Sequence, residues 1–280
     1  MKICDLHVHS FFSDGTYSPE EIIDSAIDAG LSAVALCDHN TVDGLSDFLS
    51  AAEGKDITAI AGTEFSVDYN GRELHLLGLF IPRESFGSVS DMMRELQKRK
   101  EESNIHLIES LNRAGYDISF AEIKATTPRG KFNRAHIAAA LTRKGYTRSV
   151  KQAFDTLLSP AAGHYQEPKL PNIWEMLDFI REIGAVSVLA HPFLNLNENE
   201  LDLFLPEAKK RGLIGMECLY STYSEETTAC AFKLADKYEL LYSGGSDFHG
   251  DGKPDISIGS GKGNLKIPLE WAEKLKNAAE

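Results

Sequence analysis

The sequence predicts an α/β barrel-like domain that is interrupted by a helical insertion. Apolar segments typical of buried strands alternate with amphipathic helical segments at both ends of the chain, which is the pattern of a largely parallel sheet. The expected parallel strands begin near residues 3, 33, 57, 75, 185, 213 and 240. Residues 88–158 show helical periodicity alone. We therefore expect residues 1–82 and 170–280 to form the barrel, and residues 83–169 to form the insertion.

The first expected strand, residues 3–8, ends at two histidines, His7 and His9. Side chains alternate along a strand, so both imidazoles point to the same face, where they can bind one metal ion. An imidazole and carboxylate site suits zinc, manganese or iron rather than calcium. Taken alone, the pair is equally well explained as a chance His-x-His in an ordinary strand.

Polar side chains recur where the other expected strands end. These are His39, Glu64, His191, Glu217, Asp247 and His249. His75 lies on the second strand of an expected hairpin with an Asn70-Gly71 type I′ turn. Active sites of α/β barrels are built at the rim formed by the carboxyl ends of the strands. The recurrence therefore predicts a metal site at this rim.

Composition narrows the classes of partner. The net charge of −13 argues against a broad basic surface for duplex DNA. No run of eighteen apolar residues and no signal peptide is found, so we expect no membrane span. The four cysteines are scattered and match neither a disulfide framework nor zinc spacing, so we expect a cytoplasmic protein whose thiols are small core residues.

The order of these short motifs resembles the PHP family, which is named for its polymerase and histidinol phosphatase members. The motifs are Asp5-x-His7-x-His9-Ser10, Ser13-Asp14-Gly15, Asp38-His39, Gly62-Thr63-Glu64, His75, Ala190-His191-Pro192 and Gly245-Ser246-Asp247-Phe248-His249-Gly250. They span residues 5 to 250, which is nearly the whole chain. The resemblance implies a distorted seven-stranded (β/α) barrel, similar to a TIM barrel, that holds up to three metals.

The insertion resembles one branch of that family. The segment Asn133-Arg134-Ala135-His136-Ile137-Ala138, with Tyr165-x-x-Pro168-Lys169, is similar to phosphatases of 3′,5′-nucleoside bisphosphates, some of which also trim short RNA from its 5′ end. Two positions depart from the usual family pattern. Asn40 stands where an aspartate is common, and Ala135 stands where a proline is common.

The resemblance implies a set of metal ligands. One metal would be held by His7, His9, Glu64 and Asp247, a second by Asp14, His39 and His249, and a third by Glu64, His75 and His191. We expect two or three divalent ions, manganese first, with zinc or iron as alternatives because the same nitrogen and oxygen ligands accept them. Glu64 can bridge two cations through its two oxygens.

The expected reaction is hydrolysis of a phosphomonoester by a metal-activated hydroxide. The expected substrate is a small nucleotide such as a 3′,5′-nucleoside bisphosphate, with an AMP-like product, and short single-stranded RNA is a further candidate. We assign catalysis to Asp38, His191 and Arg134, with Asp38 orienting an imidazole or accepting a proton. Arg134, His136 and Lys169 are the candidates for binding phosphate, because guanidinium pairs with phosphate bidentately.

Three alternatives stay open. Histidinol phosphate is another substrate for this class of site, although the nucleotide-type insertion disfavours it. An amidohydrolase-like hydrolase also uses His-x-His in a barrel, but it normally has a bridging lysine where this chain has Glu64. The last alternative is a non-catalytic metal-bearing module of the kind attached to polymerases.

Overall fold

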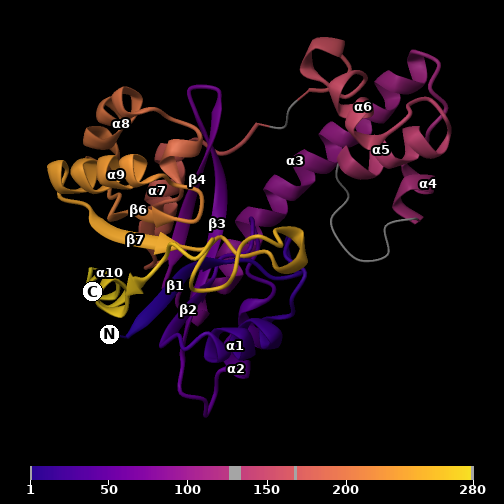
Figure 1. The fold of residues 1–280 in the computed structure, drawn as a ribbon. Helices are drawn as coiled ribbons and strands as arrows, with labels where there is room; N and C mark the ends of the chain where they lie inside the picture. Colours follow the sequence, from indigo (N-terminus) through magenta and orange to yellow (C-terminus); the bar gives the residue numbers. More distant parts are fainter. Residues whose placement is uncertain (1, 126–133, 167–168, 279–280) are drawn as a thin grey trace. The chain divides into compact units, whose positions relative to one another are not determined.

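The computed structural model describes residues 2–125, 134–166 and 169–278. These residues form two compact units: Met1–Asp91 with Leu170–Glu280, which we call the barrel unit, and Met92–Lys169, which we call the helical unit. Helix α3, Phe86–Arg113, starts in the barrel unit and continues into the helical unit (Figure 1). None of the helices in the described ranges is both long and apolar enough to cross a bilayer.

The barrel unit is built on one eight-stranded sheet in the order β7-β6-β5-β4-β3-β2-β1-β8. The strands are β1 (Ile3–Val8), β2 (Ala33–Leu36), β3 (Thr58–Tyr69), β4 (Arg72–Leu79), β5 (Val186–Leu189), β6 (Gly215–Tyr220), β7 (Leu241–Gly245) and β8 (Ile267–Pro268). Pairing is parallel within β1–β3 and within β5–β7, and β8 pairs antiparallel with β1. The α/β prediction is confirmed, with eight strands in place of seven.

Strand β4 corrects one expectation. The sequence predicts a parallel strand near residue 75, but β4 runs antiparallel to both β3 and β5. The predicted hairpin is present, with Asn70 at φ 53° and Gly71 at φ 79°. A two-residue turn of this kind joins only antiparallel strands, so the turn itself dictates the direction of β4.

Backbone contacts between the ends of β1 and β7 nearly close the sheet into a barrel. The amide of Asp247 donates to the carbonyl of His7 at 2.8 Å, and the amide of His9 donates to the carbonyl of Phe248 at 2.9 Å. A Cβ atom at Gly245 would lie 2.2 Å from the Cβ of His7, so only glycine permits this approach. This closure brings candidate site residues from the beginning of the chain next to those near its end.

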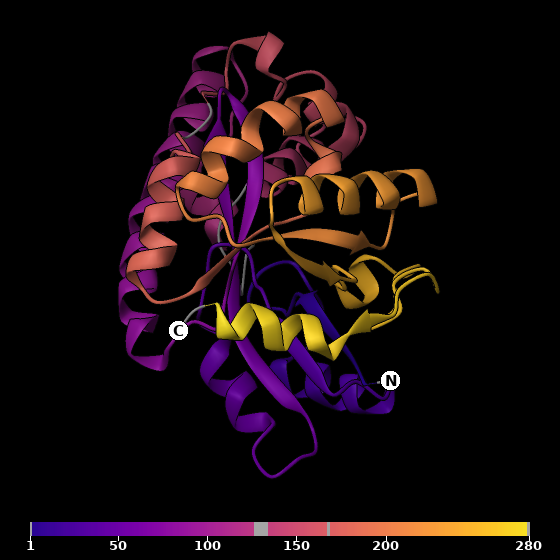
Figure 2. The same ribbon diagram turned by 90° about the vertical axis from the view of Figure 1, so that its left-hand side faces the viewer.

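Helices cover the sheet of the barrel unit (Figures 1 and 2). They are α1 (Pro19–Asp28), α2 (Leu45–Ala51), α7 (Ile173–Glu182), α8 (Glu198–Lys210), α9 (Glu225–Lys237) and α10 (Leu269–Asn277), with short 3₁₀ turns η1 (Arg83–Ser85), η3 (Pro192–Leu194) and η4 (Gly250–Gly252). The predicted capping box of α1 is present between Ser18 and Glu21. Figure 2 shows α10, in yellow, whose Ala272 and Leu275 join the core beside Cys4 of β1.

The helical unit has its own apolar core. Helices α4 (Phe120–Ala125), α5 (Arg134–Arg143) and α6 (Val150–Asp155) pack with the second half of α3, and η2 (Pro160–Ala162) follows. Leu107 and Leu111 of α3 meet Ile137 and Leu141 of α5 in that core. The helical expectation for residues 88–158 is therefore confirmed for the described residues.

Candidate metal centre

The centre begins at the end of β1. Every residue from Cys4 to Val8 is buried, because neighbouring elements cover both faces of this strand. Cys4 and Leu6 point into the hydrophobic core, and the side chain of His7 points to the opposite face of the strand. His7 and His9 are both fully buried, and their ring centroids lie 5.0 Å apart.

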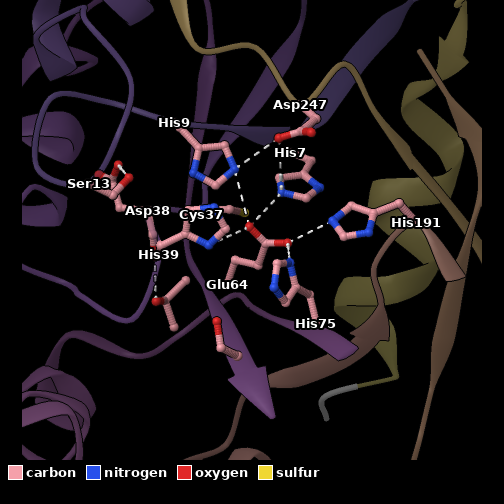
Figure 3. A network of polar contacts seen from close by, with 12 residues as sticks. His7, His9, Ser13, Cys37, Asp38, His39, Glu64, His75, His191 and Asp247 are labelled. Carbon is pink, nitrogen blue, oxygen red and sulfur yellow. Dashed lines mark hydrogen bonds and ion pairs between the residues drawn. The ribbon is translucent and has the colours of Figure 1, made fainter. Parts of the chain in front are cut away.

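Glu64 of β3 contacts five histidines and lies in the middle of the centre. Its Oε2 atom lies 3.3 Å from Nε2 of His7, 3.3 Å from Nε2 of His9 and 3.0 Å from Nδ1 of His39. Its Oε1 atom lies 2.7 Å from Nδ1 of His75 and 2.9 Å from Nε2 of His191. Figure 3 shows these five imidazoles arranged around the one buried carboxylate. The two oxygens of Glu64 thus face two different groups of histidines.

Two aspartates complete the arrangement. Oδ1 of Asp247 lies 3.2 Å from Nε2 of His9, which is the same nitrogen that lies 3.3 Å from Oε2 of Glu64. Oδ1 of Asp14 lies 3.2 Å from Nε2 of His249, and its Oδ2 lies 3.6 Å from Nε2 of His39. The structure therefore brings together all the side chains that the sequence assigns to metal binding.

Hydrogen bonds fix the tautomers of two of these histidines. Nδ1 of His7 lies 3.0 Å from Oε1 of Glu217, and an ionised carboxylate accepts only, so the imidazole donates from Nδ1. Nδ1 of His249 lies 2.8 Å from the carbonyl oxygen of Asp247, which also requires a donor. With Nδ1 as the donor, the neutral form of each ring carries its lone pair on Nε2, which is the form that binds metal.

Several buried atoms of the centre have no hydrogen-bond partner among the described residues. They are Nε2 of His7, both ring nitrogens of His9 and Oε2 of Glu64. Leaving such atoms unpaired in the interior is costly. A divalent cation would satisfy Nε2 of His7, Nε2 of His9 and Oε2 of Glu64 together, since these nitrogen and carboxylate donors converge. The residues present therefore fit a metal site.

The charge states of the centre also suit cations. Burial lowers the pKa of His9 to about 3, so that ring is neutral at pH 7. Burial opposes ionisation of Glu64, but His39, His7 and His75 outweigh it and hold the pKa of that carboxyl well below its usual range. Burial likewise opposes protonation of His75, yet the charge of Glu64 raises its pKa to about 10. The field that attracts a proton here attracts a metal cation in the same way.

Backbone strain accompanies the centre. His191 has φ 27°, and Asp247 and Asn40 have φ 56° and 51°. Residues other than glycine adopt this left-handed region at a cost of about 1–3 kcal/mol, and such strain clusters at functional sites. His191 is held there by its amide, which donates to Oε2 of Glu217 at 2.6 Å.

Asp38 contacts a loop instead of an imidazole. Its carboxylate accepts hydrogen bonds from the amide of Ser10 at 2.8 Å, the hydroxyl of Ser10 at 2.6 Å and the hydroxyl of Ser13 at 2.6 Å. This loop carries Asp14. In the structure the carboxylate of Glu217 contacts Nδ1 of His7, whereas that of Asp38 contacts the loop of Asp14. The catalytic role of Asp38 stays a prediction.

The predicted phosphate-binding residues lie in the helical unit. Cζ of Arg134 lies 4.0 Å from the ring centroid of Tyr165 and 6.0 Å from that of Phe154. The guanidinium is therefore held by aromatic faces, and His136 follows it on α5. Lys169 is exposed. Asn133 and Pro168, which belong to the same sequence motifs, lie outside the described residues.

Two further residues contact the centre, and the sequence predicts no role for either of them. The hydroxyl of Tyr220 donates to Oδ2 of Asp247 at 2.7 Å, and Nζ of Lys253 lies 2.6 Å from the same oxygen. Tyr220 stands in an apolar strand and is easily taken as a core residue. Lys253 follows Gly250–Gly252 in a segment without periodicity, so no sequence signal points to it.

Comparison with known proteins finds relatives over most of the chain. A family model described as the PHP domain matches residues 5–187. The chain is 28% identical over 249 residues to a 5′-3′ exoribonuclease of Haemophilus influenzae, covering 89% of this chain and 90% of that protein. It is 26% identical to a 3′,5′-nucleoside bisphosphate phosphatase of Chromobacterium violaceum, covering 92% and 91%. It is 27% identical to a phosphoribosyl 1,2-cyclic phosphate 1,2-diphosphodiesterase of Eggerthella lenta, covering 88% and 94%.

Solved structures share the fold over almost the whole chain. A presumed metal-dependent phosphoesterase from Bifidobacterium adolescentis superposes with a TM-score of 0.77 at 25% identity, covering 99% of this chain and 96% of that one. A protein from Chromobacterium violaceum described as an amidohydrolase gives a TM-score of 0.78 at 24% identity, covering 98% and 96%. The second likeness concerns the fold alone.

Proposed function

This chain belongs to the PHP domain family, and from that premise we propose that it hydrolyses the phosphomonoester of a small nucleotide, with a 3′,5′-nucleoside bisphosphate as the first candidate. The observation that carries the proposal is the contact of the buried carboxylate of Glu64 with five imidazoles from different strands and loops of the barrel. The 5′ ends of short RNA are the second candidate substrate, supported by the exoribonuclease relative.

We assign the ligands of two or three divalent cations to the three donor sets that the family resemblance implies. The sets are His7, His9, Glu64 and Asp247; Asp14, His39 and His249; and Glu64, His75 and His191. The close groups of donors in the structure support this assignment in part, and they are His7, His9 and Glu64; His9, Asp14, His39 and His249; and His39, Glu64 and His75. Manganese is the first candidate, and zinc or iron are alternatives with the same donors. When bound, such cations supply Lewis acidity that activates water and polarises a phosphoryl group.

The protein's own residues prepare this site. Glu64 places one oxygen in each of two donor sets, so it fixes their spacing. Glu217 holds the tautomer of His7 and the backbone of His191, and Asp38 holds the loop of Asp14. Hydrolysis by a metal-activated hydroxide would not require a nucleophilic side chain of the protein.

We assign substrate choice to the helical insertion. Arg134, His136 and Lys169 are its candidates for phosphate contacts, because a phosphomonoester carries two charges and the barrel centre is rich in carboxylates. The aromatic stacking of Arg134 keeps its guanidinium edge available for bidentate hydrogen bonds.

The test is phosphate release by the purified protein supplied with manganese. The panel contains a 3′,5′-nucleoside bisphosphate, a 5′-phosphorylated short RNA, histidinol phosphate, a 1,2-cyclic phosphate of ribose and an aryl phosphate. We expect the bisphosphate to be hydrolysed with the highest kcat/KM. Failure to hydrolyse any member would refute the proposal, and preference for the cyclic phosphate would move the chain to the activity named for the Eggerthella relative.

Two variants tie activity to the site. Glu64→Gln and His39→Ala should abolish hydrolysis while circular dichroism shows a folded chain, because each removes a donor to the centre. Full activity in both variants would place the reaction elsewhere. Phosphate release also separates the proposal from an amidohydrolase and from a non-catalytic metal-bearing module.

A further inference from the structure

Lys253 reaches the edge of the centre through Asp247. Its Nζ atom lies 2.6 Å from Oδ2 of Asp247, and Oδ1 of the same carboxylate lies 3.2 Å from Nε2 of His9. The carboxylate of Asp247 is therefore the one group between this ammonium and the donors of the centre. A phosphate bound at those donors would lie within reach of the Lys253 side chain.

The charge of Lys253 is unusual in its surroundings. The carboxylates at the centre are Asp14, Glu64, Glu217 and Asp247. Within the described part of the chain, their ion-pair partners are histidines, with Lys253 as the single lysine or arginine. A phosphomonoester dianion that approaches these carboxylates is stabilised by a permanent positive charge in addition to the proposed cations.

Asp247 does not need the ammonium for its hydrogen bonding. Its Oδ2 atom already accepts from the hydroxyl of Tyr220 at 2.7 Å. A lysine ammonium has three donors, and Asp247 is its one hydrogen-bond partner within the described residues. The Lys253 side chain is 38% exposed, whereas that of Asp247 is 6% exposed. The ammonium therefore lies between the buried centre and solvent, where a substrate arrives.

The loop that carries Lys253 is anchored. The amide of Lys253 donates to the carbonyl of Gly250, and the amide of Asp251 donates to Oγ1 of Thr16 at 2.9 Å. Gly250 has φ +63°, and a Cβ atom there would lie 2.2 Å from that same Oγ1, so the close contact depends on glycine. Thr16 belongs to the segment that carries Asp14. This anchoring presents the ammonium without a large ordering cost on binding.

We propose that Lys253 is a substrate-binding residue, which holds the outer oxygen of Asp247 with one donor and binds a phosphoryl oxygen with another. This inference deepens the proposed function and rests on it. It assigns a phosphate contact to the barrel itself, in addition to those expected from the helical insertion. The ligand class is a phosphate monoester or the inorganic phosphate released from it.

The experiment compares Lys253→Met with three other variants. Lys253→Arg keeps the charge, Tyr220→Phe removes the neutral donor from the same oxygen of Asp247, and Lys237→Met removes an exposed lysine that pairs with Asp202 on the surface. Each manganese-loaded protein is titrated with inorganic phosphate in a calorimeter. Metal content is measured by mass spectrometry, and kcat and KM are measured with the nucleoside bisphosphate.

We expect Lys253→Met to bind phosphate roughly 10- to 100-fold more weakly and to raise KM by a similar factor, because one charge-assisted hydrogen bond is lost. Lys253→Arg should recover most of this loss. Lys237→Met should bind phosphate as the wild type does, and Tyr220→Phe should keep more of the phosphate affinity than Lys253→Met. Metal content should be unchanged in Lys253→Met.

Three results would overturn the inference. Wild-type phosphate affinity in Lys253→Met excludes the contact. Equal defects in Lys253→Met and Tyr220→Phe, with loss of metal, would show that Lys253 only positions Asp247. If either result is found in a protein that hydrolyses the bisphosphate, this inference fails and the proposed function stands. A wild-type protein that neither hydrolyses the panel nor binds phosphate refutes both.

Discussion

Glu217 of β6 accepts a hydrogen bond from Nδ1 of His7 on β1 at 3.0 Å, although the two residues are 210 positions apart in the sequence. The other oxygen of Glu217 accepts from the amide of His191 at 2.6 Å. One buried carboxylate thus fixes the tautomer of one candidate ligand and the strained backbone of another. The barrel must close before either contact can form.

Glu217→Gln should weaken metal binding even though Gln has nearly the same shape. An amide has one acceptor oxygen, and the backbone N–H of His191 can only donate, so the amide oxygen faces His191 and the NH₂ group faces Nδ1 of His7. His7 then favours the tautomer that carries its proton on Nε2, which blocks the lone pair. We expect affinity for manganese to fall about 10- to 100-fold, the usual effect of removing such a partner. Calorimetric titration of the metal-free protein with manganese measures it.

The matched control is Glu53→Gln, because Glu53 is exposed in the turn after α2. Its metal affinity should equal that of the wild type. If Glu217→Gln also binds manganese like the wild type, Glu217 does not set the tautomer of His7.

Divalent metal should stabilise the barrel unit strongly. The unpartnered atoms of His7, His9 and Glu64 are buried in the folded chain and hydrated in the unfolded one, so a cation binds the folded state preferentially. A concentration of 100 Kd adds about 2.7 kcal/mol per site, which for a chain of this size is roughly 5–10 °C in Tm. Differential scanning calorimetry with manganese and then with excess chelator tests this. A Tm that is indifferent to both would argue against a metal centre here.

Asp38→Asn should destabilise the chain by about 1–3 kcal/mol, because at least one of the three donors from Ser10 and Ser13 loses its acceptor in the interior. Urea unfolding gives the change in free energy. The control is Asp24→Asn, which removes the charge from the exposed Asp24–Lys55 pair and should cost no more than about 1 kcal/mol. Equal effects of the two substitutions would show that Asp38 does not anchor the Asp14 loop.

Part of the centre could be predicted from the sequence because several of its donors follow apolar strands, whereas Glu64 and His75 lie inside β3 and β4. His39 and His191 each stand just after such a strand, and the carboxyl ends of parallel strands meet at one rim. The antiparallel direction of β4 was also implicit in the Asn70–Gly71 turn, although counting strands alone gives the wrong direction.

The contacts that orient these donors could not be predicted in the same way. Lys253 meets Asp247 because η4 folds back on Thr16, and no periodicity encodes the path of a loop. Tyr220 looks like a core aromatic until its hydroxyl is placed on Asp247. Asp38 stands beside His39 in the sequence, yet its carboxylate is directed at serine donors that lie more than twenty residues earlier.

Arg134→Lys should raise KM for the nucleoside bisphosphate while leaving kcat nearly unchanged, because the insertion is proposed to bind substrate and not to supply metal ligands. Lysine keeps the charge but loses the planar fork and the stacking on Tyr165, where the guanidinium lies 4.0 Å from the ring centroid. The loss of one bidentate pair corresponds to roughly a 10- to 100-fold change. Steady-state kinetics on the bisphosphate measures both constants, with Arg143→Lys as the control because Arg143 forms an exposed pair with Glu122 in the same unit. A fall in kcat with unchanged KM would instead place Arg134 in the chemical step, and no effect on either would remove it from the site.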